Sequence, residues 1–185
     1  MTHNISEIHT PRLILRQWKT EDLPEFARMN ADEQVMRFFP ATMTPEQTQA
    51  LYERIQREFV QRGYGLYAAQ LRNSGEFIGF IGFHRAEFDA DFCPCVEIGW
   101  RLSARHWGQG YAPEGARACL EHGFSRLGLD AVYSFTAVVN EPSQRVMQKI
   151  GMKQHCHFDH PNVAQNDRLR PHVCYRIVGE RPEKE

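Results

Sequence analysis

The stretch from residue 96 to residue 124 contains the residue types that could bind a phosphorylated ligand. Gly108 and Gly110 lie in a short loop between an apolar segment that ends at Leu102 and an amphipathic segment with Pro113 in its first turn. Glycine lets the backbone turn sharply and approach a ligand closely, and a helix start has unpaired N–H groups with a partial positive charge. The pattern therefore predicts a strand, a loop and a helix start that together bind an anion such as a diphosphate.

The pattern Arg105-x-x-Gly108-x-Gly110 resembles the acetyl-coenzyme-A signature of the GNAT superfamily of N-acetyltransferases. The surrounding sequence is similar to the branch of that superfamily that contains the ribosomal-protein N-terminal alanine and serine acetyltransferases. The resemblance runs from about residue 11 to residue 175. The segments that carry it are Pro11–Arg16, Glu97–Leu102, Tyr111–Ala112, Asn140–Val146 and Lys149–Met152.

The length predicts one domain, which the resemblance makes an N-acetyltransferase domain over residues 1–180, and the residues at 181–185 predict a loose charged tail. The implied α/β (α+β) fold has a mixed, mostly antiparallel sheet of about seven strands, a splay between strands 4 and 5, and about four flanking helices. The residue pattern agrees with this order. It predicts strands near 12–17, 66–71, 76–83, 96–102, 131–138, 153–158 and 172–178, and helices near 20–30, 44–63, 111–127 and 142–151.

The splay would be the slot for acetyl-CoA, the co-substrate that the resemblance implies. Backbone groups of the fourth strand would bind the pantetheine arm and polarise the thioester carbonyl, and main-chain N–H groups of the loop would bind the diphosphate. The expected cofactor-binding residues are Ile98, Trp100, Leu102, Arg105, His106, Trp107, Gly108, Gln109, Gly110, Tyr111, Asn140 and Arg145.

A general base is needed because acetyl transfer requires a neutral amine. An α-amine titrates near ~7.8 and a lysine amine near ~10.4, so some group should accept the proton. Glu97 is the first candidate because it lies on the strand that borders the slot and could act through one water molecule. A structural ion pair is its alternative role, and His84 and His172 are the weaker base candidates.

The CoA thiolate that leaves also needs a group that protonates it or donates a hydrogen bond to it. Another branch of the superfamily uses a tyrosine four residues before the helix-ending glycine, and Met147 occupies that position here. The resemblance points instead to Ser143 as the group that donates a proton to the thiolate or hydrogen-bonds it. The structural alternative is a helix cap, supplied by either Ser143 or Asn140.

Composition limits the other function classes. The 185 residues include 22 basic and 23 acidic side chains, so nothing predicts a nucleic-acid or anionic membrane partner. Five cysteines, no signal pattern and no long apolar run predict a reduced, cytoplasmic setting. His155 and His157 lie two apart, but no cysteine or carboxylate pattern completes a zinc site, so we expect no metal.

We therefore expect an acetyl-CoA-dependent N-acetyltransferase in which a primary amine attacks the thioester directly. The amine acceptor, a protein N-terminus or a small molecule, and the oligomeric state stay open. Two alternatives remain, a non-catalytic CoA-binding module and a nucleotide-binding oxidoreductase. The second is disfavoured because Pro113 stands at the third-glycine position of a dinucleotide-binding loop.

Overall fold

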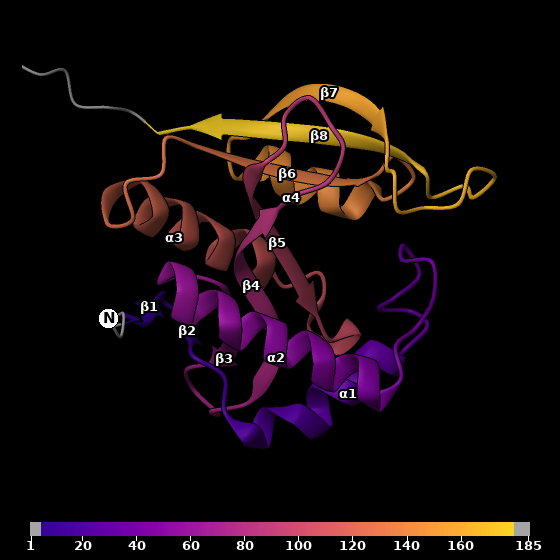
Figure 1. The fold of residues 1–185 in the computed structure, drawn as a ribbon. Helices are drawn as coiled ribbons and strands as arrows, with labels where there is room; N and C mark the ends of the chain where they lie inside the picture. The colour runs from indigo at the N-terminus through magenta and orange to yellow at the C-terminus, as the bar shows by residue number, and fades with distance from the viewer. Residues whose placement is uncertain (1–4, 180–185) are drawn as a thin grey trace, which may run out of the picture.

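The computed structural model of the protein describes residues 5–179, which form one eight-stranded sheet in the order β1-β2-β3-β4-β5-β6-β8-β7 (Figure 1). Every neighbouring pair is antiparallel except β5 and β6. The strands are β1 Ile8–His9, β2 Leu13–Arg16, β3 Leu66–Leu71, β4 Phe77–Ala86, β5 Cys95–Leu102, β6 Ala131–Ala137, β7 Lys153–Asp159 and β8 Pro171–Val178.

Four α-helices flank the sheet: α1 Leu23–Ala31, α2 Pro45–Arg62, α3 Tyr111–Ser125 and α4 Glu141–Lys149. The expected α/β fold is confirmed, with one strand more than predicted. The extra strand, β1, has only two residues, too few for a sequence period to identify it. The tail predicted at 181–185 lies outside the described residues.

Local signals fix the ends of α2 as the sequence predicts. The Thr44 hydroxyl accepts a hydrogen bond from the Gln47 N–H at 3.2 Å, and the Gln47 side chain accepts one from the Thr44 N–H at 2.8 Å. This reciprocal capping satisfies two donors at the helix start. Gly63 ends the helix with φ 74°. In contrast, α3 ends at Ser125, before the predicted end near Gly128.

The sheet opens between β5 and β6. These parallel strands pair at one position only, Glu97 with Tyr133, although β5 continues to Leu102 and β6 to Ala137. They correspond to the fourth and fifth predicted strands, so the expected splay is present. Because α3 follows β5 and α4 follows β6, both helices begin at the end of the sheet where the strands diverge (Figure 1).

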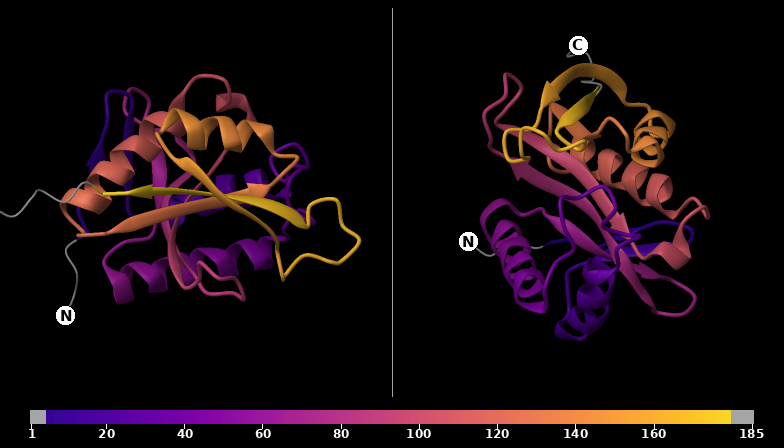
Figure 2. Two further views of the ribbon diagram at one scale, coloured as in Figure 1. Left: turned by 90° about the horizontal axis from the view of Figure 1, so that it is seen from above. Right: turned by 90° about the vertical axis from the view of Figure 1, so that its right-hand side faces the viewer.

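The helices lie in two layers, α1 and α2 on one face of the sheet and α3 and α4 on the other (Figure 2). The main core fills both interfaces with buried aliphatic and aromatic side chains. A second, small cluster of Ala137, Val163 and Leu169 packs against Phe38, so it joins the loop over 160–170 to the loop over 32–44 beside the end of β6. Within residues 5–179, no helix has the length and apolar character needed to cross a membrane.

A buried ion pair fixes the entry into α1. Arg16 and Asp22 are 5% and 4% exposed, and the guanidinium donates two hydrogen bonds of 2.8 Å to the two carboxylate oxygens. The Arg16 Nε donates a third bond, 2.7 Å long, to Gln70 on β3. Asp22 is the residue immediately before α1, so the pair ties this helix to the sheet. The far end of α1 carries Asn30, which contacts the site described below.

We expect Asp22→Asn to lower the free energy of unfolding by about 3–5 kcal/mol, because it leaves the buried guanidinium without a counter-charge. Urea unfolding followed by circular dichroism measures the change. Glu141→Gln is the control, since it breaks the exposed pair between Glu141 and Arg145 and should leave stability almost unchanged. Equal losses in the two variants would contradict the assigned role of the buried pair.

Candidate active site

The loop between β5 and α3 presents backbone N–H groups beside open space. Gly108 and Gly110 have φ of 73° and 83°, which places both in the left-handed region. No acceptor among residues 5–179 bonds the N–H groups of Gly108, Gln109 or Gly110. A Cβ built at Gly108 would meet no heavy atom within 4 Å. Free donors, open space and a helix start together fit an oxyanion such as a diphosphate.

The larger side chains of the loop contact other parts of the chain, although Arg105 itself is exposed. The Arg105 Nη2 atom lies 2.6 Å from a Glu76 carboxylate oxygen, and the Nε2 atom of buried His106 lies 3.7 Å from the other oxygen. The Trp107 Nε1 atom donates a hydrogen bond of 2.8 Å to the carbonyl of Leu102. These side chains brace the loop, so its main chain is what remains available to a ligand.

Arg12 is a structural residue of the loop that the sequence did not identify. Its Nη1 atom donates a hydrogen bond of 2.8 Å to the carbonyl of Gln109, and its Nε lies 2.6 Å from the Glu114 carboxylate in the first turn of α3. The guanidinium also lies 4.5 Å from the ring centre of Tyr111. Arg12 thus holds the loop and the helix start together. Nothing local in the sequence links positions so far apart.

Successive residues of β5 direct their backbone hydrogen-bonding groups alternately toward β4 and toward β6. The Ser103 N–H donates a hydrogen bond of 2.9 Å to the carbonyl of Ile78 at the end of the β4–β5 ladder. In an antiparallel ladder, every second residue then directs its backbone groups away from the partner strand. These residues are Leu102, Trp100 and Ile98, the three that the sequence predicted for the slot. Their backbone groups therefore face the side on which β6 diverges.

Glu97, the predicted base, lies at the start of this divergence. It pairs with Tyr133 on β6 and stands opposite His84 in the β4–β5 ladder. The side chain is half-buried, and burial raises the pKa of the Glu97 carboxyl to about 7. The positive charge of His84 lowers this pKa, while the carboxylate of Glu58 raises it.

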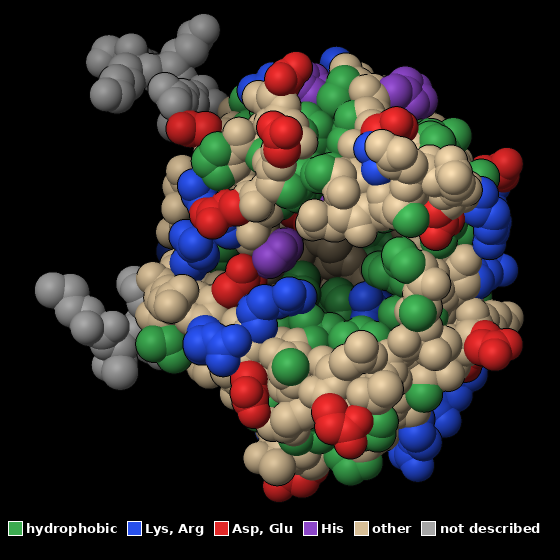
Figure 3. Space-filling model, turned by 45° about the vertical axis from the view of Figure 1, so that its right-hand side comes forward, with side chains coloured by type: hydrophobic (Ala, Val, Ile, Leu, Met, Phe, Trp, Pro, Cys, Tyr) green, Lys and Arg blue, Asp and Glu red, His purple; other side chains and the backbone are tan. Residues whose placement is uncertain are grey.

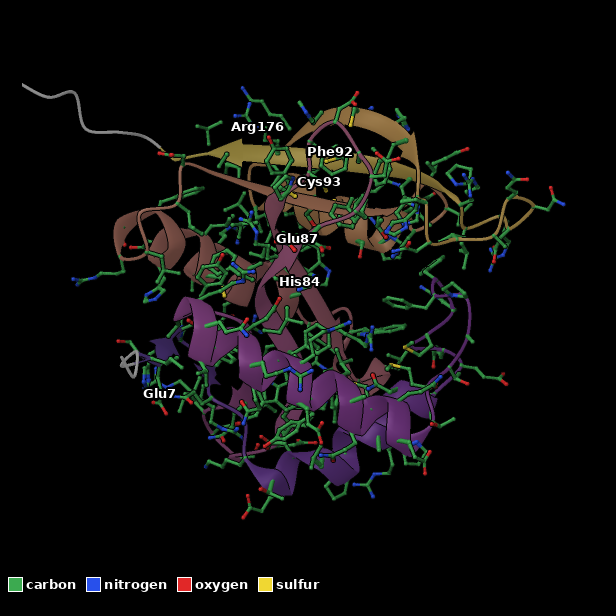
Figure 4. All side chains as sticks on the ribbon, viewed as in Figure 1. Glu7, His84, Glu87, Phe92, Cys93 and Arg176 are labelled. Carbon is green, nitrogen blue, oxygen red and sulfur yellow. The ribbon has the colours of Figure 1, made fainter. Side chains whose placement is uncertain are left out.

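His84 is bound to a second carboxylate. Its Nδ1 atom lies 2.9 Å from Glu58 Oε1 on α2. Burial lowers the pKa of His84, but the hydrogen bond and the charge of Glu58, together with the charge of Glu97, outweigh burial and raise it overall. Figure 4 shows His84 on β4 between α2 and the layer formed by β6 and β8. The structure thus brings Glu58, His84 and Glu97 into one cluster.

This cluster opens onto a hollow of about 300 Å³. Figure 3 shows the hollow on one face of the molecule, with histidine, acidic and basic side chains at its rim. The lining combines charged residues with aromatic rings, so it can accept a polar ligand. The lining residues are His84, Arg85, Ala86, Glu87, Phe88, Glu97, Phe135, His160 and Asn162.

The contacts at the start of α4 show which residue caps the helix, a choice between Asn140 and Ser143 that the sequence left open. The Asn140 side-chain oxygen accepts a hydrogen bond of 3.3 Å from the Ser143 N–H, so Asn140 is the helix cap. The Asn140 amide also donates a bond of 2.9 Å to Thr136. The hydroxyl of half-buried Ser143 is not the cap. Arg145, predicted to bind the cofactor, is exposed and pairs with Glu141 at 3.2 Å.

His172, the other weaker base candidate, lies on β8 in an aromatic cluster. Its ring centre is 4.9 Å from that of His160 and 5.5 Å from that of Phe158. Burial lowers the pKa of His172, although a hydrogen bond to the Arg170 carbonyl opposes the change. Within residues 5–179, no three His, Cys, Asp or Glu side chains are placed to hold a metal ion.

Comparisons with known proteins identify the chain's relatives. Residues 12–153 match the family model described as Acetyltransferase (GNAT) domain. The uncharacterized N-acetyltransferase YnaD of Bacillus subtilis is 30% identical over 152 residues, which are 82% of this chain and 85% of that protein.

Two solved structures have the same fold. The GNAT-family acetyltransferase from Bacillus anthracis superposes with a TM-score of 0.78 at 26% identity, covering 94% of this chain and 98% of that chain. RimL, a ribosomal L7/L12 alpha-N-protein acetyltransferase solved in complex with coenzyme A, superposes with a TM-score of 0.76 at 18% identity, with coverage of 94% and 98%.

We expect Gly108→Ala to raise the dissociation constant for acetyl-CoA about tenfold or more, because the methyl group enters the open space beside the free N–H groups. Calorimetry measures the affinity. Gly128→Ala is the matched control, since Gly128 has φ 66° and equally open surroundings at the other end of α3. Both variants should lose about 1 kcal/mol of stability to backbone strain. Parent affinity in folded Gly108→Ala would place the diphosphate elsewhere.

Proposed function

Because the chain belongs to the GNAT acetyltransferase family, it is an acetyl-CoA-dependent N-acetyltransferase, and we propose that a primary amine attacks the thioester directly while Glu97 accepts its proton. The observation that carries the assignment is the place of Glu97, at the divergence of β5 and β6 and on the wall of the hollow. RimL acts on a ribosomal protein, which supports a protein N-terminus as one acceptor class to test beside small amines.

Two parts of the chain fit acetyl-CoA, which supplies the acetyl group as an activated thioester. The N–H groups over 108–110 and the start of α3 would hold the diphosphate. The β5 backbone at Ile98 and Trp100 would hold the pantetheine arm, whereas the Leu102 carbonyl already accepts a bond from Trp107. Asn140 would contribute less than the sequence predicts, because its amide has two partners within the chain.

The pKa of Glu97 suits the proposed proton transfer. A carboxyl with a pKa of about 7 is partly ionised at neutral pH and is a stronger base than an ordinary glutamate. This value lies close to that of an α-amine, near ~7.8, so little free energy separates donor and acceptor. We propose that His84, held by Glu58, is a positioning residue that tunes the pKa of Glu97.

We expect Glu97→Gln to lower kcat by about a hundredfold or more, within the range for loss of a general base. In the parent, kcat should rise with pH through about 7, because only the ionised carboxylate accepts a proton. The variant should lack this rise and keep only the pH dependence that comes from titration of the amine itself. Initial rates of thiol release between pH 5.5 and 9, with one saturating amine, measure both effects.

His84→Gln is the control for this assignment. It removes a positive charge that lowers the pKa of Glu97, so the rise in kcat should move to higher pH while turnover above it persists. Because the same amine is used throughout, its own titration is common to all variants. A Glu97→Gln enzyme with the parent's turnover and pH profile would contradict the role of Glu97.

We propose that Ser143 hydrogen-bonds the departing thiolate. The hydroxyl lies in the first turn of α4, next to the strand that borders the slot, and Asn140 already fills the capping role. The partial positive charge of the helix start would also stabilise an anionic thiolate there. Met147, the position of tyrosine in another branch, is 1% exposed and lies in the core.

Ser143→Ala should lower kcat about tenfold, with the acetyl-CoA affinity and melting temperature little changed, because the capping oxygen belongs to Asn140. The comparison variant is Asn140→Ala, which should lose about 0.5–2 kcal/mol of stability. Thiol release, calorimetry and thermal melts separate the effects. If Ser143→Ala instead lowers only the melting temperature, the hydroxyl has a structural role.

We also propose that the chain is one domain and that it works in the cytoplasm. The sheet continues from the family-matched segment to Val178, which supports one domain over residues 1–180. The five cysteines are free thiols, which supports a reducing, cytoplasmic setting. Neither the oxidoreductase nor the non-catalytic module gains support from the comparisons, since the matched relatives carry acetyltransferase names.

A further inference from the structure

Arg101 is a half-buried cation on the same strand as Glu97. Its guanidinium lies 4.4 Å from the ring centre of Phe39 and 5.3 Å from that of Phe80. The Nη1 atom donates a hydrogen bond of 2.7 Å to the side-chain oxygen of Asn30 on α1. Among residues 5–179, Arg101 forms no ion pair with a carboxylate, and its buried Nε has no hydrogen-bond partner.

This environment leaves the charge of Arg101 uncompensated. Burial, with a smaller contribution from the nearby positive charge of Arg54 on α2, lowers the pKa of the guanidinium to about 10. Buried charges in proteins are usually paired, because an unpaired one loses much of its solvation. The Arg16 guanidinium shows the paired arrangement in this same chain, with both carboxylate oxygens of Asp22 bound.

Gly99 keeps the surface open between Arg101 and Glu97. In a strand, every second side chain lies on the same face, so positions 97, 99 and 101 share one face of β5. A Cβ built at Gly99 would meet only the Glu97 Oε1 atom, at 4.0 Å. Along the strand, the Cα atoms of Glu97 and Arg101 are about 13 Å apart. The open space above Gly99 therefore lies between the proposed base and the unpaired guanidinium.

We propose that Arg101 binds an oxyanion of the acceptor, and that the acceptor is an anionic primary amine whose amino group lies over Gly99 beside Glu97. The inference rests on the proposed function and names its substrate class. From Gly99 to Arg101 the strand advances about 7 Å, so the amine and the oxyanion are separated by only a few bonds. A carboxylate or a phosphate on a short chain fits this spacing.

The same charges select against other amines. A diamine would place a second cation against Arg101 and Arg54, and like charges brought together in a half-buried site repel strongly. A neutral amine would leave Arg101 unpaired. A site with an unpaired polar group discriminates against ligands that have no group to pair with it. We therefore expect the preference to appear mainly in KM.

The test compares amines that differ chiefly in the terminal group. The panel contains 3-aminopropanoate, O-phosphoethanolamine, neutral 3-aminopropanol, cationic 1,3-diaminopropane, and peptides that begin with Ser or Ala. With acetyl-CoA in excess, thiol release gives kcat and KM for each amine. We expect kcat/KM for the carboxylate or the phosphate to exceed that for the neutral amine at least about tenfold. The two anionic amines distinguish the two sources of oxyanion.

Variants test whether Arg101 is responsible. Arg101→Gln should abolish the preference through KM, with the rate for 3-aminopropanol and the acetyl-CoA affinity retained, and Arg101→Lys should restore part of it. Because Arg101 contacts Asn30, melting temperatures accompany both. Arg54→Gln, at an exposed position, should reduce the preference to a smaller extent without affecting folding. Arg126→Gln, exposed at the far end of α3, is the control and should change nothing.

Each outcome bears on one proposal. Equal kcat/KM for anionic and neutral amines in the parent would overturn the anion site, as would an anion preference that persists in Arg101→Gln. A peptide N-terminus acetylated best, with no effect of Arg101→Gln, would also overturn it. Failure of the proposed transfer is distinguishable, because then no amine or peptide in the panel would release thiol.

Discussion

The single backbone contact between β5 and β6 is the constraint on which the site depends. Parallel strands ordinarily share evenly spaced hydrogen bonds along their length, yet these two pair only where Glu97 meets Tyr133. Beyond that point the facing edges lack a partner strand inside a folded sheet. Unpaired backbone groups in a protein interior are costly unless something bonds them. We therefore propose that the divergence is the binding slot, and both α3 and α4 begin beside it.

In the proposed site, one strand supplies both the groups that face the slot and the side chains that face the acceptor, because successive residues of a strand point to opposite sides. Residues 98, 100 and 102 direct backbone groups toward the slot, whereas Glu97, Gly99 and Arg101 share the face that carries α1 and α2. Burial disfavours the charged form of both ionisable groups, raising the pKa of Glu97 and lowering that of Arg101. The carboxyl is thereby suited to accept a proton, and the guanidinium to accept an anion.

The sequence predicted what local patterns encode. The glycine loop, the capped start of α2 and the order of strands follow from turn residues, caps and periods of two or 3.6 residues. The capping choice between Asn140 and Ser143 stayed open because both residue types cap helices. Contacts between residues far apart in the sequence could not be predicted. Glu58 and His84 are 26 positions apart, and Asn30 and Arg101 are 71 apart. No periodicity links such residues, so the role that we propose for Arg101 could not be predicted from the sequence.

Positions 97, 99 and 101 each break a rule for a strand inside a protein. A carboxyl and a guanidinium are half-buried without a salt bridge between them, and a glycine replaces the β-branched residue that a central strand favours. Glycine in a strand interior costs roughly 0.5–1 kcal/mol relative to alanine. These departures weaken the isolated fold but together leave an open surface with a base at one end and a cation at the other. Local rules are broken together where function requires it, and we propose that an amine that carries an oxyanion compensates for the departures at these three positions.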